Sequence, residues 1–159
     1  MKTKLSADVL KALAGRKLAT AESLTGGGIG SAITSVSGAS KVYAGGIISY
    51  TNEVKHRVLG VPMEDLDNLG AVSAPVAQAM AEGACRVLQA EAAVSVTGLA
   101  GPDGDEFGHP VGTVVIGYAD ERTAFAREYL FDGSREQVRE QTVEAALALN
   151  LEQNREYNK

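Results

Sequence analysis

The chain has 159 residues, a length that suits a single domain with its own hydrophobic core. Its hydrophobic fraction of 45% and charged fraction of 22% are those of an ordinary globular protein, which excludes extensive disorder. The net charge of −5 argues against a nucleic-acid-binding protein, because such proteins present a basic face to the phosphates.

Residues 1–16 begin with basic residues, as a signal peptide does, but Asp8 and Lys11 interrupt the apolar run that secretion requires. No stretch approaches the ~20 apolar residues of a membrane span. The single cysteine, Cys85, excludes internal disulfides and fits a buried thiol on an alanine-rich helix. We therefore expect a cytoplasmic protein with no membrane or nucleic-acid partner.

The first half of the chain predicts helices that alternate with strands. Ser6 and Gly15 bracket an expected helix over residues 7–14, and residues 17–21 form a short buried strand. The other expected elements are a helix over 25–36, a strand over 42–50 ("VYAGGIISY"), a helix from the cap Asn52 to Gly60, and a helix over 63–69 that ends at Gly70.

The second half predicts a long helix, a strand, a hairpin and a final helix. Ser73 caps a helix with Pro75 in its first turn, and residues 92–97 ("AAVSVT") form a strand before the glycine-rich loop "GLAGPDGDEFGHP". The segments "VGTVVIGYA" and "TAFAREYLF" flank the turn "DER" and predict an antiparallel hairpin. Ser134 and Gln137 form a capping box for a helix that runs to about residue 151 and leaves a frayed tail.

The order of these elements predicts an α/β fold. Strands that alternate with helices favour parallel pairing, because a parallel connection needs a long crossover, whereas a tight turn joins antiparallel strands. We therefore expect a three-layer α/β/α single domain over residues 1–159, with a mixed, mostly parallel sheet and a late antiparallel hairpin.

Residues 19–30, "ATAESLTGGGIG", place an acid, a serine and a glycine cluster where a strand passes into a helix. A dinucleotide fingerprint needs an acidic residue ~20 positions further along, but that position falls within "YAGGIISY". A phosphate-binding loop needs Gly-Lys-Ser/Thr after the glycines, which is absent. Two interpretations remain: a turn that presents Ser23 as a nucleophile, or a tight turn that Ser23 merely caps.

A nucleophilic serine at this turn would lie at the carboxyl edge of the sheet, where open α/β sheets bind ligands. The N–H groups of the following helix start can hold an anion or an oxyanion, and the glycines let a ligand approach the backbone. The serine also needs a base. The two histidines, His56 and His109, have no obvious acid beside them and suit surface positions. No metal-binding pattern of histidines and cysteines is present.

Lys55 is the other candidate base, as in Ser-Lys hydrolases. It follows the expected cap Asn52, so the positive end of the helix dipole disfavours its ammonium form. Burial would lower its pKa further, and a neutral lysine can abstract a proton. Tyr50, at the end of the preceding strand, could share or relay that proton. The alternative is a solvated lysine beside a core tyrosine.

Five ordered segments resemble the C-terminal domain of the CinA competence/damage-inducible proteins and the stand-alone nicotinamide-nucleotide amidases: "TAESLTGG", "GGIISYTNEVKHRVLGV", "GAVS", "SVTGLAGPDG" and "PVGTV". The likeness runs from about residue 6 to 150, without the molybdopterin-binding-like domain of full-length CinA. It implies hydrolysis of nicotinamide mononucleotide to nicotinate mononucleotide and ammonia. No metal or organic cofactor is implied.

The resemblance implies catalytic roles for Ser23, Tyr50 and Lys55, the residues that the chemistry had already singled out. Ser23 would attack the amide carbon, Lys55 and Tyr50 would take its proton, and N–H groups of residues 25–27 would stabilise the oxyanion. For Glu22 two interpretations remain: it orients Lys55 or the turn, or it has only a surface role. The resemblance also implies substrate-binding residues in the glycine-rich stretches and on the last helix: Thr25, Gly26, Gly27, Gly98, Gly101 and Arg139.

The chain departs from the family pattern at two places. Leu24 stands where many members carry cysteine, a swap that should be tolerated, and the segment "DEFGH" (residues 105–109) is variable and receives no role. The expected partner is a small-molecule nucleotide substrate, and we expect a homo-oligomer. A non-catalytic nucleotide-binding or regulatory module is the alternative, but binding alone would not require a lysine base.

Overall fold

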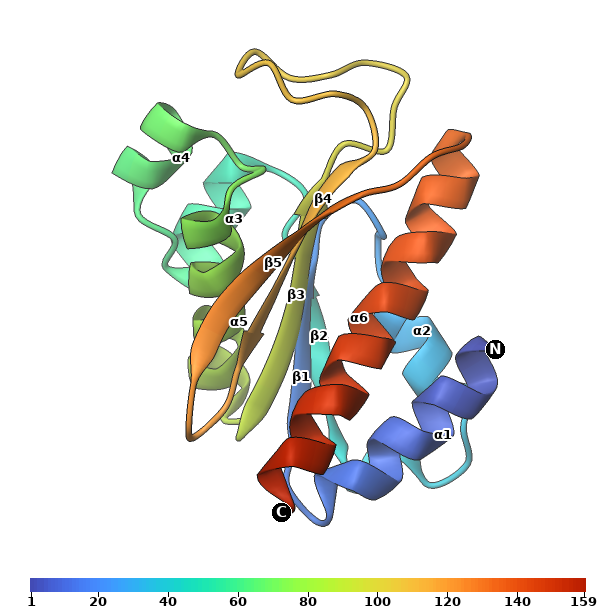
Figure 1. The fold of residues 1–159 in the computed structure, drawn as a ribbon. Coiled ribbons are helices and arrows are strands. Elements are labelled where there is room, and N and C mark those ends of the chain that lie inside the picture. Colours follow the sequence, from blue (N-terminus) through green and yellow to red (C-terminus); the bar gives the residue numbers. More distant parts are fainter.

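A five-stranded sheet forms the middle layer of the computed structural model, which describes residues 1–159 (Figure 1). The strand order is β2-β1-β3-β4-β5. β1 pairs parallel with β2 and with β3, whereas β3, β4 and β5 pair antiparallel, so the expected mixed sheet and late hairpin are confirmed. The strands are β1 Leu18–Glu22, β2 Tyr43–Ile48, β3 Ala92–Gly98, β4 Thr113–Ala119 and β5 Ala124–Leu130.

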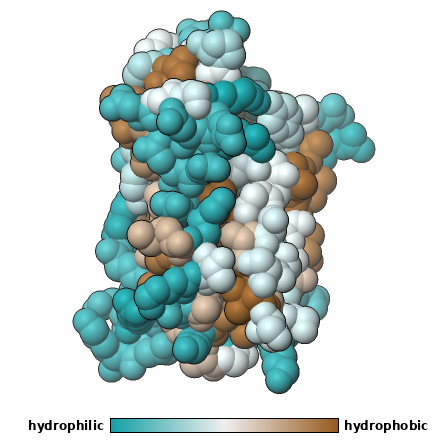
Figure 2. Space-filling model, turned by 90° about the vertical axis from the view of Figure 1, so that its right-hand side faces the viewer, coloured by the Kyte–Doolittle hydropathy of each residue, from teal (hydrophilic) through white to brown (hydrophobic).

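Helices cover both faces of the sheet, as the three-layer prediction requires (Figure 1). One layer consists of α1 Lys2–Leu13, α2 Gly28–Thr34 and α6 Arg135–Tyr157. The other consists of α3 Asn52–Leu59, α4 Met63–Leu69 and α5 Ala74–Leu88. A short 3-10 helix, η1 Ala39–Lys41, precedes β2. In Figure 2, which looks onto the side that carries α6 and α1, hydrophilic and neutral residues cover most of the surface between small hydrophobic patches.

Alternation along the buried strands divides the core between the two faces. In β1, Leu18 belongs to the core under α1, α2 and α6, whereas Ala19 and Ala21 belong to the core under α5. The small residues let α5 lie close to the sheet. Gly117 in β4 is required there, since a Cβ at this position would lie 2.2 Å from the Ala77 carbonyl oxygen of α5.

Three helix caps differ from the prediction. Thr51 rather than Asn52 caps α3, because its hydroxyl accepts from the Val54 N–H at 3.3 Å. Ser73 precedes α5, but its hydroxyl donates to the Gly70 carbonyl instead of capping the helix. α1 begins at Lys2, so Ser6 lies inside it and is buried. The capping box of Ser134 and Gln137 at the start of α6 is confirmed.

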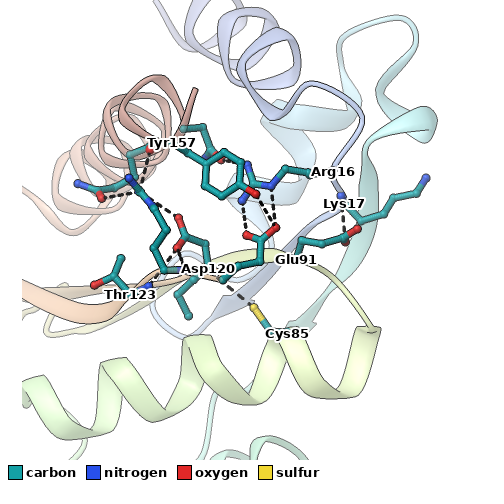
Figure 3. Close-up of polar contacts among 12 residues, drawn as sticks. Arg16, Lys17, Cys85, Glu91, Asp120, Thr123 and Tyr157 are labelled. Atoms are coloured by element: carbon teal, nitrogen blue, oxygen red, sulfur yellow. Dashed lines mark hydrogen bonds and ion pairs between the residues drawn. The ribbon is translucent and has the colours of Figure 1, made fainter. Parts of the chain in front are cut away.

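The C-terminal tail does not fray but continues α6 to Tyr157. The Arg16 guanidinium lies 3.6 Å from the centre of the Tyr157 ring and donates to Asn154 Oδ1 at 2.7 Å and to Glu121 Oε1 at 2.6 Å (Figure 3). Cation–π contact and charge-assisted hydrogen bonds therefore join the tail to two distant turns. Cys85 lies nearby, half-buried, and burial raises the pKa of its thiol to about 11.

Residues 99–112 connect β3 to β4 and form the β3–β4 loop. In Figure 1 it rises above the sheet between α4 and the beginning of α6. Because β1, β2 and β3 are parallel, their carboxyl ends meet at this same edge of the sheet. The loop therefore stands over the place where the turns that follow β1 and β2 come together.

Candidate active site

Ser23 follows β1 directly and is held by the sheet. Its N–H donates to the Val96 carbonyl of β3 at 3.1 Å, and its own carbonyl accepts from the Gly26 N–H at 3.1 Å. The chain then turns sharply through Gly26 and Gly27, whose φ angles of 58° and 102° suit glycine. Ser23 is 8% exposed, so only a small part of it faces solvent.

Lys55 reaches Ser23 from α3, 32 residues further along the chain. Its Nζ lies 3.0 Å from Ser23 Oγ and donates to the Ser49 carbonyl at 2.8 Å. Ser49 directly follows β2, and its own N–H donates to the Glu22 carbonyl at 2.7 Å. The lysine therefore bridges the carboxyl ends of the two neighbouring strands β1 and β2.

The environment of Lys55 disfavours a positive charge. The residue is 1% exposed, its two hydrogen-bond partners are neutral, and it forms no salt bridge. Burial lowers the pKa of its amine from 10.5 to about 8. About a tenth of the amine is therefore neutral at pH 7, and the lone pair of this neutral form can accept the Ser23 proton.

Glu22 organises the turn and does not contact Lys55. Its carboxylate is buried and accepts hydrogen bonds from Thr25 Oγ1 at 2.5 Å, from the Ile29 N–H at 2.9 Å and from the Gly30 N–H at 3.0 Å. The acid thus neutralises the positive end of α2. The start of this helix, which we expected to hold an anionic substrate group, is occupied by the protein's own carboxylate.

A cleft of about 400 Å³ opens beside Ser23 and Lys55. The backbone segments 70–72 and 97–100 form part of its lining. The charged side chains Asp105, Glu106 and Arg135 also line it, together with Phe107. The cleft therefore combines a nucleophile–base pair with groups of both charges.

Tyr50 lies in the cleft lining but is not joined to the Ser23–Lys55 pair. It is 60% exposed, and its hydroxyl accepts from Arg135 Nη2 at 3.4 Å. No hydrogen bond links it to Ser23 or Lys55, because the chain leaves β2 at Ile48 and turns the tyrosine toward solvent. Tyr50 therefore lies at the solvent side of the cleft and makes no hydrogen bond to the serine or the lysine, so its predicted role in taking the serine proton stays a prediction.

Most of the residues expected to bind substrate lie outside the cleft. Gly98 lines it, but Thr25, Gly26, Gly27, Gly101 and Arg139 do not. The Arg139 guanidinium donates to the Leu24 carbonyl at 2.9 Å and to the Thr25 carbonyl at 3.3 Å. These hydrogen bonds stabilise the turn that follows Ser23. Gly26 and Gly27 form the tight turn after Ser23, whereas Gly101 lies in the β3–β4 loop.

Arg135, one helical turn before Arg139, lines the cleft although no sequence pattern indicated it. Its Nη1 donates to the Gly101 carbonyl at 2.6 Å, which ties the start of α6 to the β3–β4 loop. His109, which was expected to have no acid beside it, has one: Asp105 Oδ2 lies 2.7 Å from His109 Nδ1. The only sign of this pair in the sequence was the spacing of four residues between Asp105 and His109. Such a spacing predicts a contact in a helix but not in a loop, because a loop has no fixed periodicity.

No set of three or more histidine, cysteine, aspartate or glutamate side chains is arranged to hold a metal ion. None of the helices combines the length and apolar character needed to cross a membrane.

The fold and the site define an α/β/α domain that carries a serine–lysine pair at the carboxyl edge of its sheet. The CinA C-terminal domain family model matches residues 2–153, and the chain belongs to this family. A relative from Pseudomonas putida, named nicotinamide-nucleotide amidohydrolase PncC, is 48% identical over 131 residues, 82% of each chain. A CinA-like protein of Geobacter sulfurreducens is 48% identical over 136 residues, but the chain spans only 32% of its length.

Solved structures of the same family share the fold. A CinA superfamily protein from Klebsiella pneumoniae superposes with a TM-score of 0.94 at 32% identity, over 98% of this chain and 99% of that one. A competence/damage-inducible protein from Agrobacterium tumefaciens superposes with a TM-score of 0.88 at 37% identity, over 93% and 92%. The resemblance that the five segments indicated is therefore confirmed.

Proposed function

We propose that the protein hydrolyses the carboxamide of nicotinamide mononucleotide to nicotinate mononucleotide and ammonia. The observation that carries this proposal is the buried contact of 3.0 Å between Lys55 Nζ and Ser23 Oγ beside a cleft. Such a pair supplies a nucleophile and a base without histidine. The relative named nicotinamide-nucleotide amidohydrolase supports the choice of substrate.

In the first half of the reaction, Ser23 Oγ attacks the carboxamide carbon while neutral Lys55 takes the hydroxyl proton. The tetrahedral intermediate then collapses, the C–N bond breaks, and Lys55 returns the proton to the leaving ammonia. In the second half, water attacks the acyl-serine ester and Lys55 takes a proton from that water. The ester bond breaks, Ser23 recovers its proton, and the carboxylic acid leaves. A general base of this kind contributes ~10²–10⁴-fold to a rate.

The oxyanion needs a donor that the protein does not already use. The Gly26 N–H is bonded to the Ser23 carbonyl, which removes one member of the expected set of residues 25–27. The Leu24 N–H directly follows the nucleophile, has no acceptor within the protein, and belongs to a residue that lines the cleft. We assign the oxyanion contact to this N–H group.

The substrate phosphate needs a cation in the cleft. Arg135 lines the cleft, whereas Arg139 is turned toward the backbone carbonyls of Leu24 and Thr25. Arg135 Nη1 donates to the Gly101 carbonyl at 2.6 Å, but Nη2 contacts only the Tyr50 hydroxyl at 3.4 Å and can make a charge-assisted hydrogen bond to a phosphate. We assign phosphate binding to Arg135, with the exposed Tyr50 hydroxyl as its neighbour.

The direct test is ammonia release from nicotinamide mononucleotide by the wild type and by Ser23→Ala. Ser23→Ala should keep the fold, because alanine fits the turn, and should lose nearly all activity. A variant that retains more than about a tenth of the wild-type turnover would exclude the covalent mechanism. Nucleotide binding by the wild type without ammonia release would favour the non-catalytic module instead.

A further inference from the structure

Phe107, at the tip of the β3–β4 loop, lines the cleft with a ring that remains 40% exposed. Part of the ring packs on Gly70, the residue that ends α4, where an added Cβ would lie 2.6 Å from Phe107 Cδ2. The glycine thus makes room for the ring. A large apolar side chain is held in the lining, yet part of its surface is left uncovered.

The loop tip that carries Phe107 is organised by one carboxylate. Asp105 Oδ1 accepts from the Phe107 N–H at 3.1 Å and the His109 N–H at 3.0 Å, and Oδ2 lies 2.7 Å from His109 Nδ1. Burial raises the pKa of Asp105, but the hydrogen bonds from His109 and Phe107 outweigh this effect and hold the pKa below its usual value. The carboxylate is therefore charged at neutral pH and holds the loop backbone at Phe107 and His109.

The same loop contributes negative charge beside the ring. Asp105 and Glu106 both line the cleft with Phe107. An aromatic face with adjacent carboxylates suits a flat cation, because the ring quadrupole and the negative charges both attract positive charge. A simple apolar ligand would gain nothing from the carboxylates, and a simple anion would be repelled by them.

We propose that Phe107 is a specificity-determining residue that stacks on the cationic pyridinium ring of the substrate, with Asp105 and Glu106 complementing its charge. The inference rests on the proposed function, since nicotinamide mononucleotide carries such a ring. It also deepens that proposal, because it gives the ring and the phosphate different partners. The loop discriminates the oxidised, positively charged pyridinium from the reduced, neutral dihydropyridine.

The test compares Phe107→Leu with wild type on oxidised and reduced nicotinamide mononucleotide. Phe107→Leu keeps an apolar side chain of similar bulk but removes the aromatic face. We expect KM for the oxidised substrate to rise about tenfold, which lies between the effects of an exposed and a fully desolvated cation–π contact, with kcat changed less than about threefold. The wild-type preference for the oxidised over the reduced nucleotide should fall by a similar factor. Phe125→Leu, on β5 outside the cleft, is the matched control and should change neither value.

A second variant and a binding measurement keep the two proposals separate. Glu106→Gln removes an exposed charge and should raise KM about threefold at low salt and less at high salt. Binding of nicotinamide mononucleotide to Ser23→Ala, with and without Phe107→Leu, is measured by calorimetry. Ammonia release by the wild type with no effect of Phe107→Leu would overturn this inference alone. Phe107-dependent binding without ammonia release would overturn the proposed function alone, and the absence of both would overturn both.

Discussion

Lys55 Nζ lies 3.0 Å from Ser23 Oγ and 2.8 Å from the Ser49 carbonyl oxygen, with no carboxylate in contact. A surface lysine would be surrounded by water and fully charged at neutral pH. This lysine instead lies between the ends of two strands, and burial lowers its pKa to about 8. At this pKa the Lys55 amine can lose its proton and then exchange a proton with Ser23.

The pH dependence of the reaction should follow this amine. Below pH 8 the amine is protonated and cannot act as a base, so kcat/KM should rise through about pH 8 and level off above it. Initial rates of ammonia release between pH 6 and pH 10 measure this profile. A profile that is flat across that range would exclude Lys55 as the base.

Removal of the base should be more severe than removal of the neighbouring phenol. Lys55→Met keeps the length of the side chain, and Lys55→Arg keeps the charge but cannot be deprotonated. Both should lose ~10²–10⁴-fold in kcat. Tyr50→Phe should lose much less, because the Tyr50 hydroxyl makes no hydrogen bond to Ser23 or Lys55. Near-normal turnover of Lys55→Arg would make Lys55 a charge contact only.

The buried Lys55 amine should also make the free energy of unfolding depend on pH. Between pH 8 and pH 10.5 the folded state has released the Lys55 proton but the unfolded state still holds it, so the free energy of unfolding rises with pH over this window. Below pH 8 both states are protonated and the penalty is fully present. The wild type should therefore gain on the order of 3 kcal/mol relative to Lys55→Met across the window, since one pKa unit corresponds to ~1.4 kcal/mol. Urea unfolding at several pH values measures the difference.

The Glu22 carboxylate should be needed as a cap rather than as a catalyst. Glu22→Gln replaces one accepting oxygen with an amide nitrogen and leaves a buried N–H of Ile29 or Gly30 without its acceptor. The expected loss is ~1–3 kcal/mol in the free energy of unfolding, with a fall in kcat because the turn also positions Ser23. Glu64→Gln, in the first turn of α4 and exposed, is the control and should change stability by less than ~0.5 kcal/mol. Equal stability of both variants would mean that α2 does not depend on this cap.

Arg135 and Arg139, in the first turns of α6, should differ in function. A charge-assisted hydrogen bond is worth ~1.5–3 kcal/mol, so the riboside, which lacks the phosphate, should be more than tenfold poorer than nicotinamide mononucleotide in kcat/KM. Arg135→Ala should remove that preference with little loss of stability. Arg139→Ala should keep the preference but destabilise the turn that carries Ser23. Kinetics on both substrates and thermal unfolding of both variants decide between these assignments.

Short-range patterns in the sequence were sufficient to predict much of the fold. The hairpin of β4 and β5 follows from alternation around a tight turn, and the start of α6 follows from the capping box of Ser134 and Gln137. The sheet class follows from strands that alternate with helices. These features depend on neighbours within a few residues, whose hydrogen bonds and side-chain directions are set by the local backbone. The position of Ser23 at a strand-to-helix turn is of the same kind.

The sequence by itself placed Ser23 at the turn and marked Lys55 as a candidate base, but only the tertiary structure decided that the two meet. Helix α3 packs so that Lys55 Nζ lies between the carboxyl ends of β1 and β2. The resulting burial lowers the pKa of the Lys55 amine. Packing also turned Arg139 toward the backbone and left Arg135 in the cleft, although both belong to one helix. Periodicity indicates which residues share a face, but what that face meets depends on contacts between distant segments.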